Sequence, residues 1–259
     1  MTPAKPVFKN DVCEGFMKFG FKVATLATLL LIFAGAWLHW LGNAHAASHS
    51  QITGTVKLEG VAPRQRTIDM ASEPSCAALH KDKPVTAESV VVGPNGGLAN
   101  VVLYVSQGLT GKEAPSSVPV QIEQRGCQYL PHVVAVDVGQ PMKILNSDHA
   151  LHNVHPQTAS NPEWNKSQLV GGAPFDVTWT KEEVAIPIKC NIHPWMKGYI
   201  AVVKGPYAVT DGSGSFKLEN VPPGSYTLTA WQEFYGTKTQ DVTVTAGKPA
   251  SVSFTFQAR

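Results

Sequence analysis

Beyond residue 50, short hydrophobic segments alternate with polar breaks, and several segments place apolar residues at every second position. These segments are rich in β-branched and aromatic residues, and Gly, Pro, Asn or Asp separates them, which is typical of half-buried strands joined by turns. The predicted strands cover residues 52–58, 100–106, 118–123, 132–138, 141–147, 198–204, 225–231, 240–246 and 251–257. Many short strands without a long amphipathic helix predict an all-β protein built from Greek-key sandwiches. The lack of internal sequence repeats disfavours a propeller or a solenoid.

The N-terminus has a different pattern, with an apolar run at 23–41 that predicts one hydrophobic helix. Four lysines precede this run, and no Lys or Arg follows it before Lys57, so the positive-inside rule sends the remaining chain across the membrane. Residues 1–46 are therefore expected to be a signal peptide or an N-terminal membrane anchor. Ala44-His45-Ala46 suits a cleavage site, whereas the run is also long enough to span a bilayer. Either interpretation predicts a periplasmic or extracytoplasmic protein, and we favour cleavage.

Composition and charge narrow the classes of function. The chain has 259 residues, enough for one or two domains, and a net charge of +2 with 15% charged residues. This balance offers no basic face of the kind that binds nucleic acid. The GxSxG, P-loop and HExxH motifs are absent, and so is the CxxCH motif of covalent haem. The sequence therefore predicts a protein that is not an enzyme.

Cysteines in an exported domain are candidates for disulfides. Cys76 and Cys127 could pair with each other, which leaves Cys190 as the odd thiol. The alternative for the first two is a second metal site, because His80 and His132 lie close to them in sequence. The disulfide is favoured by the oxidising compartment alone.

The odd thiol lies in the sequence KCNIHPWMKG, where Cys190, His193 and Met196 follow one another at three-residue spacing. A mononuclear copper site that transfers electrons uses a thiolate, two imidazoles and a weak axial thioether, and this loop offers three of the four ligands. His152, in KILNSDHALHNVHP, is placed to supply the fourth. The methionine disfavours zinc. The competing interpretation treats the cysteine and methionine as buried packing residues and His193 as a surface turn residue.

At these two motifs, the chain resembles the cupredoxins, the type 1 blue copper proteins, and most closely the amicyanin and plastocyanin branch. The first motif is Asn146 followed by His152-Asn153-Val154, and the second runs from Cys190 to Gly198, with Trp195 where amicyanin has Phe. The resemblance covers about residues 118–204, the predicted cupredoxin domain. Within the second motif, Ile192 stands where amicyanin has proline, a departure that concerns the redox potential more than binding.

The resemblance implies one mononuclear copper ion with His152, Cys190 and His193 as equatorial ligands and Met196 as the axial ligand. It also implies that Asn153 ties the two ligand loops together and shields the sulfur.

The residues around the ligands have expected roles of their own. Pro194 and Trp195 stand beside a histidine whose edge normally reaches the surface, and they could form an apolar patch for a redox partner of cytochrome c or dehydrogenase type. Packing is an equal alternative for Trp195. His149 and His155 are expected to face solvent from a turn rather than to bind a second metal.

A second resemblance covers Ala208 to Glu233, which is similar to the carboxypeptidase regulatory-like domain, a transthyretin-like β-sandwich. The turn from Thr210 to Phe216 and the strand entry from Pro222 to Tyr226 carry it, and both are structural signals. The earlier strands of such a domain are found only near residues 52 and 98. We therefore expect a discontinuous sandwich of residues 51–112 and 205–259 with the cupredoxin domain, 118–204, inserted between them. A separate N-terminal β-domain is the simpler alternative.

Together these features predict an exported type 1-like copper protein that carries single electrons between periplasmic partners, similar to exported proteins of the methylamine-utilization type. The alternative is a copper-binding or carrier protein, or a structural β-sandwich module, without a redox role. The two differ in whether bound copper gives a thiolate absorption band.

Overall fold

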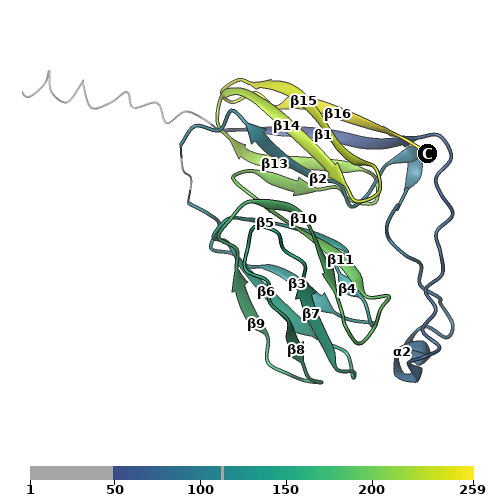
Figure 1. Ribbon diagram of the computed structural model, residues 1–259. Helices are drawn as coiled ribbons and strands as arrows, with labels where there is room; N and C mark the ends of the chain where they lie inside the picture. The colour runs from purple at the N-terminus through teal and green to yellow at the C-terminus, as the bar shows by residue number, and fades with distance from the viewer. Residues whose placement is uncertain (1–48, 112–113) are drawn as a thin grey trace, which may run out of the picture. The chain divides into compact units, whose positions relative to one another are not determined.

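The computed structural model describes residues 49–111 and 114–259, and Ala47–Arg259 forms one compact unit. The described part is almost entirely β-structure, which confirms the predicted fold class (Figure 1). Both interpretations of residues 1–46, including the helix expected at 23–41, lie outside the described residues. Within the described ranges, no helix has the length and apolar character that a membrane crossing requires.

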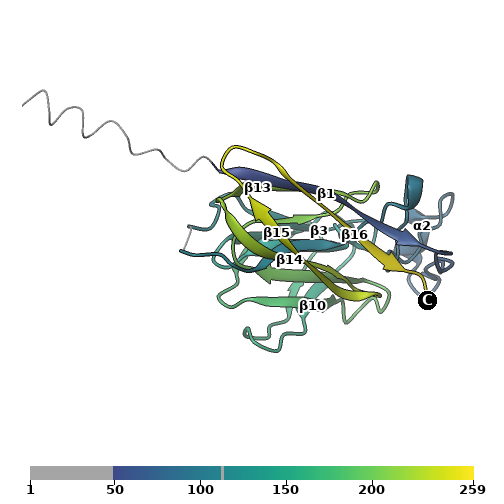
Figure 2. The same cartoon turned by 90° about the horizontal axis from the view of Figure 1, so that it is seen from above.

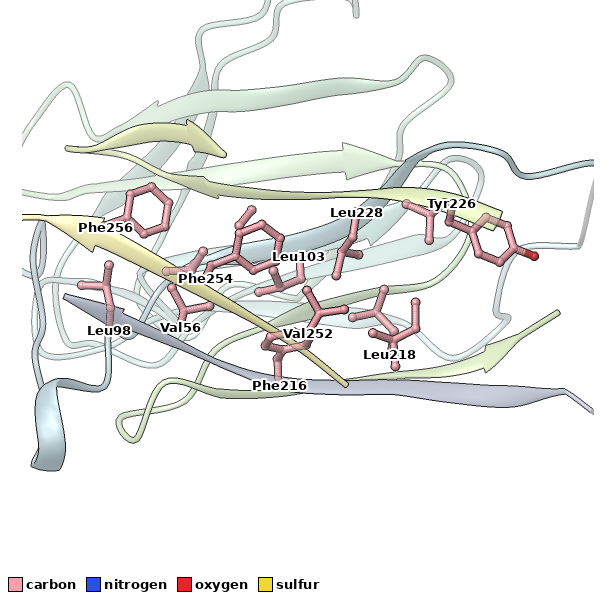
Figure 3. Packing of buried hydrophobic residues seen from close by; sticks show 14 of the residues in the cluster. Val56, Leu98, Leu103, Phe216, Leu218, Tyr226, Leu228, Val252, Phe254 and Phe256 are labelled. Carbon is pink, nitrogen blue, oxygen red and sulfur yellow. The ribbon is translucent and has the colours of Figure 1, made fainter. Parts of the chain in front are cut away.

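One sandwich is built from strands at the two ends of the described chain. Its first sheet has the order β13-β1-β16, with β13 at Ser215–Val221, β1 at Ser50–Glu59 and β16 at Ala250–Gln257. Its second sheet has the order β12-β2-β14-β15, with β12 at Tyr207–Val209, β2 at Val102–Gln107, β14 at Gly224–Gln232 and β15 at Gly236–Val244. Buried apolar side chains from both sheets fill the space between them, and Figure 3 shows Val56, Leu103, Leu228 and Phe254 meeting there.

Strands far apart in sequence pair in these sheets. β1 and β16 run parallel and side by side from Ile52 and Ala250 onward, as both views show (Figure 2). β2 pairs with both β12 and β14, so that Tyr104 lies opposite Tyr207 on one side and opposite Thr229 on the other. These pairings support a sandwich interrupted by the segment between β2 and β12. The division into domains with the boundaries given above stays a prediction.

The segment between β2 and β12 forms a second sandwich. One sheet has the order β5-β11-β10-β7-β8, with β5 at Val133–Asp137, β11 at Lys197–Val203, β10 at Glu183–Lys189, β7 at His152–Pro156 and β8 at Lys166–Gln168. The other has the order β4-β3-β6-β9, with β4 at Tyr129–Leu130, β3 at Val120–Gln124, β6 at Pro141–Asn146 and β9 at Phe175–Thr178. Alternating side chains of β6 and β10 help to fill its core, among them Met142, Ile144, Ile186 and Ile188.

The segment that carries His152 differs from the turn expected there. The turn is confined to the residues between β6 and β7. It begins at Asn146, whose Oδ1 accepts a hydrogen bond from the amide of Asp148 at 3.0 Å. From His152 onward the backbone is extended as β7, which pairs with β8 on one side and with β10 on the other. The hydrogen-bonding partners on both sides therefore outweigh the local preference for a turn.

The segment at residues 61–90, here named the α2 segment, leaves the first sandwich and packs against the second. It contains the short helix α2, Pro74–Leu79, and a separate one-turn helix η1 follows it at Pro94–Gly96. Met70 and Cys76 of the α2 segment are buried in the core of the second sandwich. A disulfide joins Cys76 to Cys127, the cysteine pair that the sequence singled out. Apart from this cysteine pair, no pattern in the sequence indicated that the segment covers the second sandwich.

Candidate metal centre

The three strongest candidate ligands converge at one end of the second sandwich. His152 is the first residue of β7, and Cys190 follows directly after β10. His193 and Met196 lie in the loop between β10 and β11. Because β10 pairs with both β7 and β11, the ends of these three strands bring the two ligand segments together.

The donor atoms are close enough to share one ion. His152, Cys190 and His193 each offer an atom, and these atoms all lie within 4.8 Å of one another. His152 Nδ1 and His193 Nδ1 are 3.0 Å apart, and Cys190 Sγ is 3.6 Å from His193 Nδ1. Donors bound to one ion at metal–nitrogen and metal–sulfur distances of about 2.0 and 2.3 Å lie roughly 3.5 Å apart. The donor set therefore fits a single small ion with nitrogen and thiolate preferences.

The site is almost closed to solvent. His152 is 0% exposed, His193 is 2% exposed and Cys190 is 3% exposed. Met196 is also buried, and the loop folds back on itself because the amide of Met196 donates to His193 O at 2.9 Å. The amide of Cys190 in turn donates to Met196 O at 3.2 Å, so backbone hydrogen bonds hold the two ends of this loop together.

Asn153 connects the two ligand segments. Its Oδ1 accepts hydrogen bonds from Cys190 Sγ at 3.3 Å and from the amide of Asn191 at 2.8 Å. Its Nδ2 donates to Asn165 Oδ1 at 2.8 Å, and its backbone carbonyl accepts from the Tyr129 hydroxyl. These contacts join the segment of His152 to that of Cys190, and a role of Asn153 in shielding a metal-bound sulfur stays a prediction.

Asp148 is a functional candidate that the sequence reasoning did not name. Its Oδ2 lies 2.8 Å from His152 Nε2, so the other ring nitrogen, Nδ1, is the one that faces His193. A carboxylate that holds the outer nitrogen of a ligand histidine is a common companion of metal sites. The signal in the sequence was its position four residues before His152.

The surroundings of Cys190, His152 and His193 shift the pKa of each side chain, and at Cys190 the shift favours the thiolate that a metal ion binds. Burial opposes ionisation of Cys190, but hydrogen bonds with His152 and with nearby backbone groups outweigh burial and lower the pKa of the thiol. Burial also opposes protonation of His152, but its contacts with Asp148 and Cys190 raise the pKa of this ring to about 9. Burial, together with the charge of His152, lowers the pKa of His193.

The two residues expected to receive a partner differ in exposure. Pro194 is exposed, whereas Trp195 is partly buried, with its ring centroid 5.2 Å from that of His193. Its indole Nε1 donates to Cys127 O at 3.1 Å. The expectation that the edge of His193 reaches the surface is not met, because only 2% of the residue is exposed.

The other histidines that the sequence singled out, all within the described ranges, lie outside the group of His152, Cys190 and His193. His149 is exposed, but His155 is not free in solvent as expected, because its ring nitrogens contact Asn191 Oδ1 at 3.2 Å and Glu163. His80 contacts Gly126 O at 2.7 Å, and His132 contacts Glu233.

Only one further group in the described ranges could hold an ion. It combines Cys127, Asp148 and His152. In this structure its cysteine sulfur is used by the disulfide.

Comparison with known proteins identifies a domain family for one end of the chain. Residues 200–257 match the family model of the carboxypeptidase regulatory-like domain, which confirms the resemblance seen between Ala208 and Glu233. The match covers less than a quarter of the 259 residues and includes β12 to β16. No curated protein matches the chain.

Several solved structures that resemble the chain are copper proteins. A copper-containing nitrite reductase from Thermus scotoductus SA-01 is 24% identical with a TM-score of 0.32, over 37% of this chain and 25% of that one. A purple cupredoxin from Nitrosopumilus maritimus is 23% identical with a TM-score of 0.28, over 32% of this chain and 98% of that one. A copper(I) amicyanin variant is 18% identical with a TM-score of 0.29, over 39% and 97%. The chain thus spans only a quarter of the nitrite reductase.

Proposed function

We propose that this chain is an exported type 1-like copper protein that carries single electrons between redox partners, and that it is not an enzyme. The observation that carries the proposal is the buried group of His152, Cys190 and His193, whose donor atoms lie within 4.8 Å of one another. One thiolate and two imidazoles in a compact arrangement, with a methionine on the same loop, suit a mononuclear copper ion better than zinc. Met196 is proposed as the axial ligand.

In this proposal copper supplies a one-electron couple, and the chain keeps the ligand geometry nearly constant in both oxidation states. Asn153 restrains the sulfur of Cys190 and the following amide through one carbonyl oxygen. The hydrogen bonds within the loop from Cys190 to Met196 restrain the second histidine. The near absence of solvent around the ligands removes the rearrangement of water that would otherwise accompany each transfer.

The partner is proposed to be an extracytoplasmic redox protein of cytochrome c or dehydrogenase type that docks near Pro194 and Trp195. Exposed apolar side chains close to the ligands in sequence support a transient contact there, because Leu151 is 40% exposed and Ile192 is 43% exposed. The N-terminal apolar run supports export, with residues 1–46 as a signal peptide or an anchor. The regulatory-like sandwich carries no proposed chemistry.

The visible absorption spectrum of the purified protein with Cu(II) tests this proposal. An intense thiolate-to-copper band is expected, and it is expected to vanish in Cys190→Ser, whereas Cys190→Ser without copper should retain the β-sheet spectrum of the wild type. Reversible reduction should bleach the band. A wild type that stays colourless at saturating Cu(II) contradicts the electron carrier.

The burial of His193 favours one second candidate, a copper-binding or carrier protein without a redox role. A partner cannot touch the ring of His193 directly, since only 2% of the residue is exposed. Exchangeable binding of Cu(I) without the visible band would identify this alternative.

A further inference from the structure

A tight turn beside the candidate copper site has an unusual backbone. Arg125 to Gln128 connect β3 to β4, and the amide of Arg125 donates to Gln128 O at 3.1 Å. The central residues, Gly126 and Cys127, have φ values of 64° and 53°. Glycine adopts this left-handed conformation readily, but Cys127 does so at a cost, so other contacts must hold it in place.

Cys127 has three such contacts, and each leads to a different part of the site. Its sulfur is bonded to Cys76 of helix α2. Its carbonyl accepts the hydrogen bond from Trp195, on the loop that carries His193. Its amide donates to Asp148 Oδ2 at 2.7 Å, while the amide of Gly126 donates to Asp148 Oδ1 at 2.6 Å.

Asp148 connects the turn at Gly126 and Cys127 to the candidate ligand His152. The carboxylate is buried, with 7% of the residue exposed, and both of its oxygens are held by amides of the turn. Its Oδ2 also contacts His152 Nε2 at 2.8 Å, so the orientation of the ring depends on the position of the carboxylate. The negative charge of Asp148 would stand one imidazole away from an ion held by His152 Nδ1, where it would be poorly screened.

We propose that Asp148, held by the disulfide-bonded turn at Gly126 and Cys127, is a positioning residue that fixes His152 and favours Cu(II) over Cu(I). This inference rests on the proposed function, because it assigns a role at the same copper site. A charge of −1 stabilises the doubly charged ion more than the singly charged one, so Asp148 lowers the reduction potential. The α2 segment takes part because its disulfide restrains the turn that holds the carboxylate.

Asp148→Asn tests the charge with little change in shape. The amide oxygen of asparagine can still accept from His152 and Cys127, so the variant removes the charge and one turn contact. The affinities for Cu(II) and Cu(I) are measured separately with competing chelators. Affinity for Cu(II) is expected to fall about 10–100-fold more than affinity for Cu(I). Each factor of ten raises the one-electron potential by about 59 mV. The matched control is Asp241→Asn, an exposed carboxylate on β15 that should leave the ratio unchanged.

An unchanged ratio of Cu(II) affinity to Cu(I) affinity in Asp148→Asn would overturn the proposal, because a purely structural role predicts equal losses for both ions. A second measurement needs no variant at Asp148. In the Cu(I) protein, nitrogen NMR of His152 should show a proton on Nε2 that exchanges slowly with water. This exchange should become faster in the double variant Cys76→Ala, Cys127→Ala. An unprotonated Nε2, or equal exchange with and without the disulfide, refutes the positioning role.

These measurements distinguish a failure of the proposed electron carrier from a failure of the positioning role of Asp148. A wild type without the visible band refutes the proposed electron carrier only. The slow Nε2 proton of His152 can then still be measured in the metal-free protein, where it decides whether Asp148 and the turn hold the ring.

Discussion

At the scale of single residues, two buried methionines allow a test of whether Met196 is a metal ligand or only a packing residue. Met196 is 1% exposed and Met142 is 0% exposed, and both contribute to the core of the second sandwich. Only Met196 lies on the loop between Cys190 and β11. Replacement of either by leucine conserves volume and should cost less than about 1.5 kcal/mol of stability.

Met196→Leu is therefore expected to keep the visible copper band and to raise the reduction potential, because the weak axial thioether donates more to Cu(II) than to Cu(I). Met142→Leu should lose similar stability without a change in potential. Voltammetry of the two copper-loaded variants beside the wild type measures this. Equal potentials in Met196→Leu and the wild type would show that the thioether is not a ligand.

The sequence pointed to the candidate ligands more readily than to the residues that contact them. Cys190, His193 and Met196 lie within one short motif, so their proximity follows from local spacing. Asp148 gave only a weak signal, because a carboxylate in a turn is normally solvated. Its burial depends on the amide of Cys127, which is 21 residues earlier in the chain. Contacts of this kind become visible only when β3 and β6 are placed side by side.

At the scale of elements, the start of β10 is secured by a carboxylate. Glu183 accepts hydrogen bonds from the amides of Ala159, Ser160 and Asn161, and so ties a loop to the strand that leads to Cys190. Burial would raise the pKa of Glu183, but these amides and the Asn161 side chain outweigh it and lower the pKa. Ionised Glu183 therefore stabilises the folded state.

Glu183→Gln should lower the free energy of unfolding by about 1 kcal/mol at neutral pH, a value reduced by the partial exposure of this carboxylate. Because the folded-state pKa is below the unfolded one, the contribution is present above about pH 4.5 and is lost as pH falls through the folded pKa. The difference between wild type and variant should therefore shrink in acid. Urea unfolding at several pH values measures it, with Glu182→Gln as the control at an exposed neighbour. A difference that grows in acid would contradict this sign.

The strands differ in how readily the pattern of apolar residues along the sequence predicts them. The strands β1, β14 and β16 were predicted because apolar residues alternate along them, and β2 was predicted because it is rich in β-branched and aromatic residues. The strands β8 and β12 are three residues long, too short for a period to be recognised. β7 was missed because its polar sequence suits a turn, and its pairing partners are distant in the chain.

At the scale of the whole molecule, β2 and β12 form an antiparallel pair whose connection contains the second sandwich. Tyr104 lies opposite Tyr207 and Val102 lies opposite Val209, so the two strand ends are already adjacent. Replacement of residues 114–204 by a short Gly-Ser loop, together with Cys76→Ser, should leave a β-sandwich that unfolds cooperatively. Its melting temperature should be lower, since Val102 and Trp231 lose contact with Val133 and Ala201.

Circular dichroism during heating measures this prediction. The same substitution of Cys76 in the full chain serves as the control for loss of the disulfide. A shortened chain without a cooperative transition would contradict this prediction, because the first sandwich would then depend on the second for its stability.

The parallel pairing of β1 with β16 has a mechanical consequence. β1 enters the sheet at the end where Ile52 faces Ala250, and β16 leaves it at the end where Glu59 faces Gln257. A force applied between the two ends of the described chain therefore acts along these strands and loads all their hydrogen bonds at once in shear. A hairpin pulled at its open end would instead lose its bonds one after another. The first sandwich is thus built to resist stretching between the start of β1 and the end of β16.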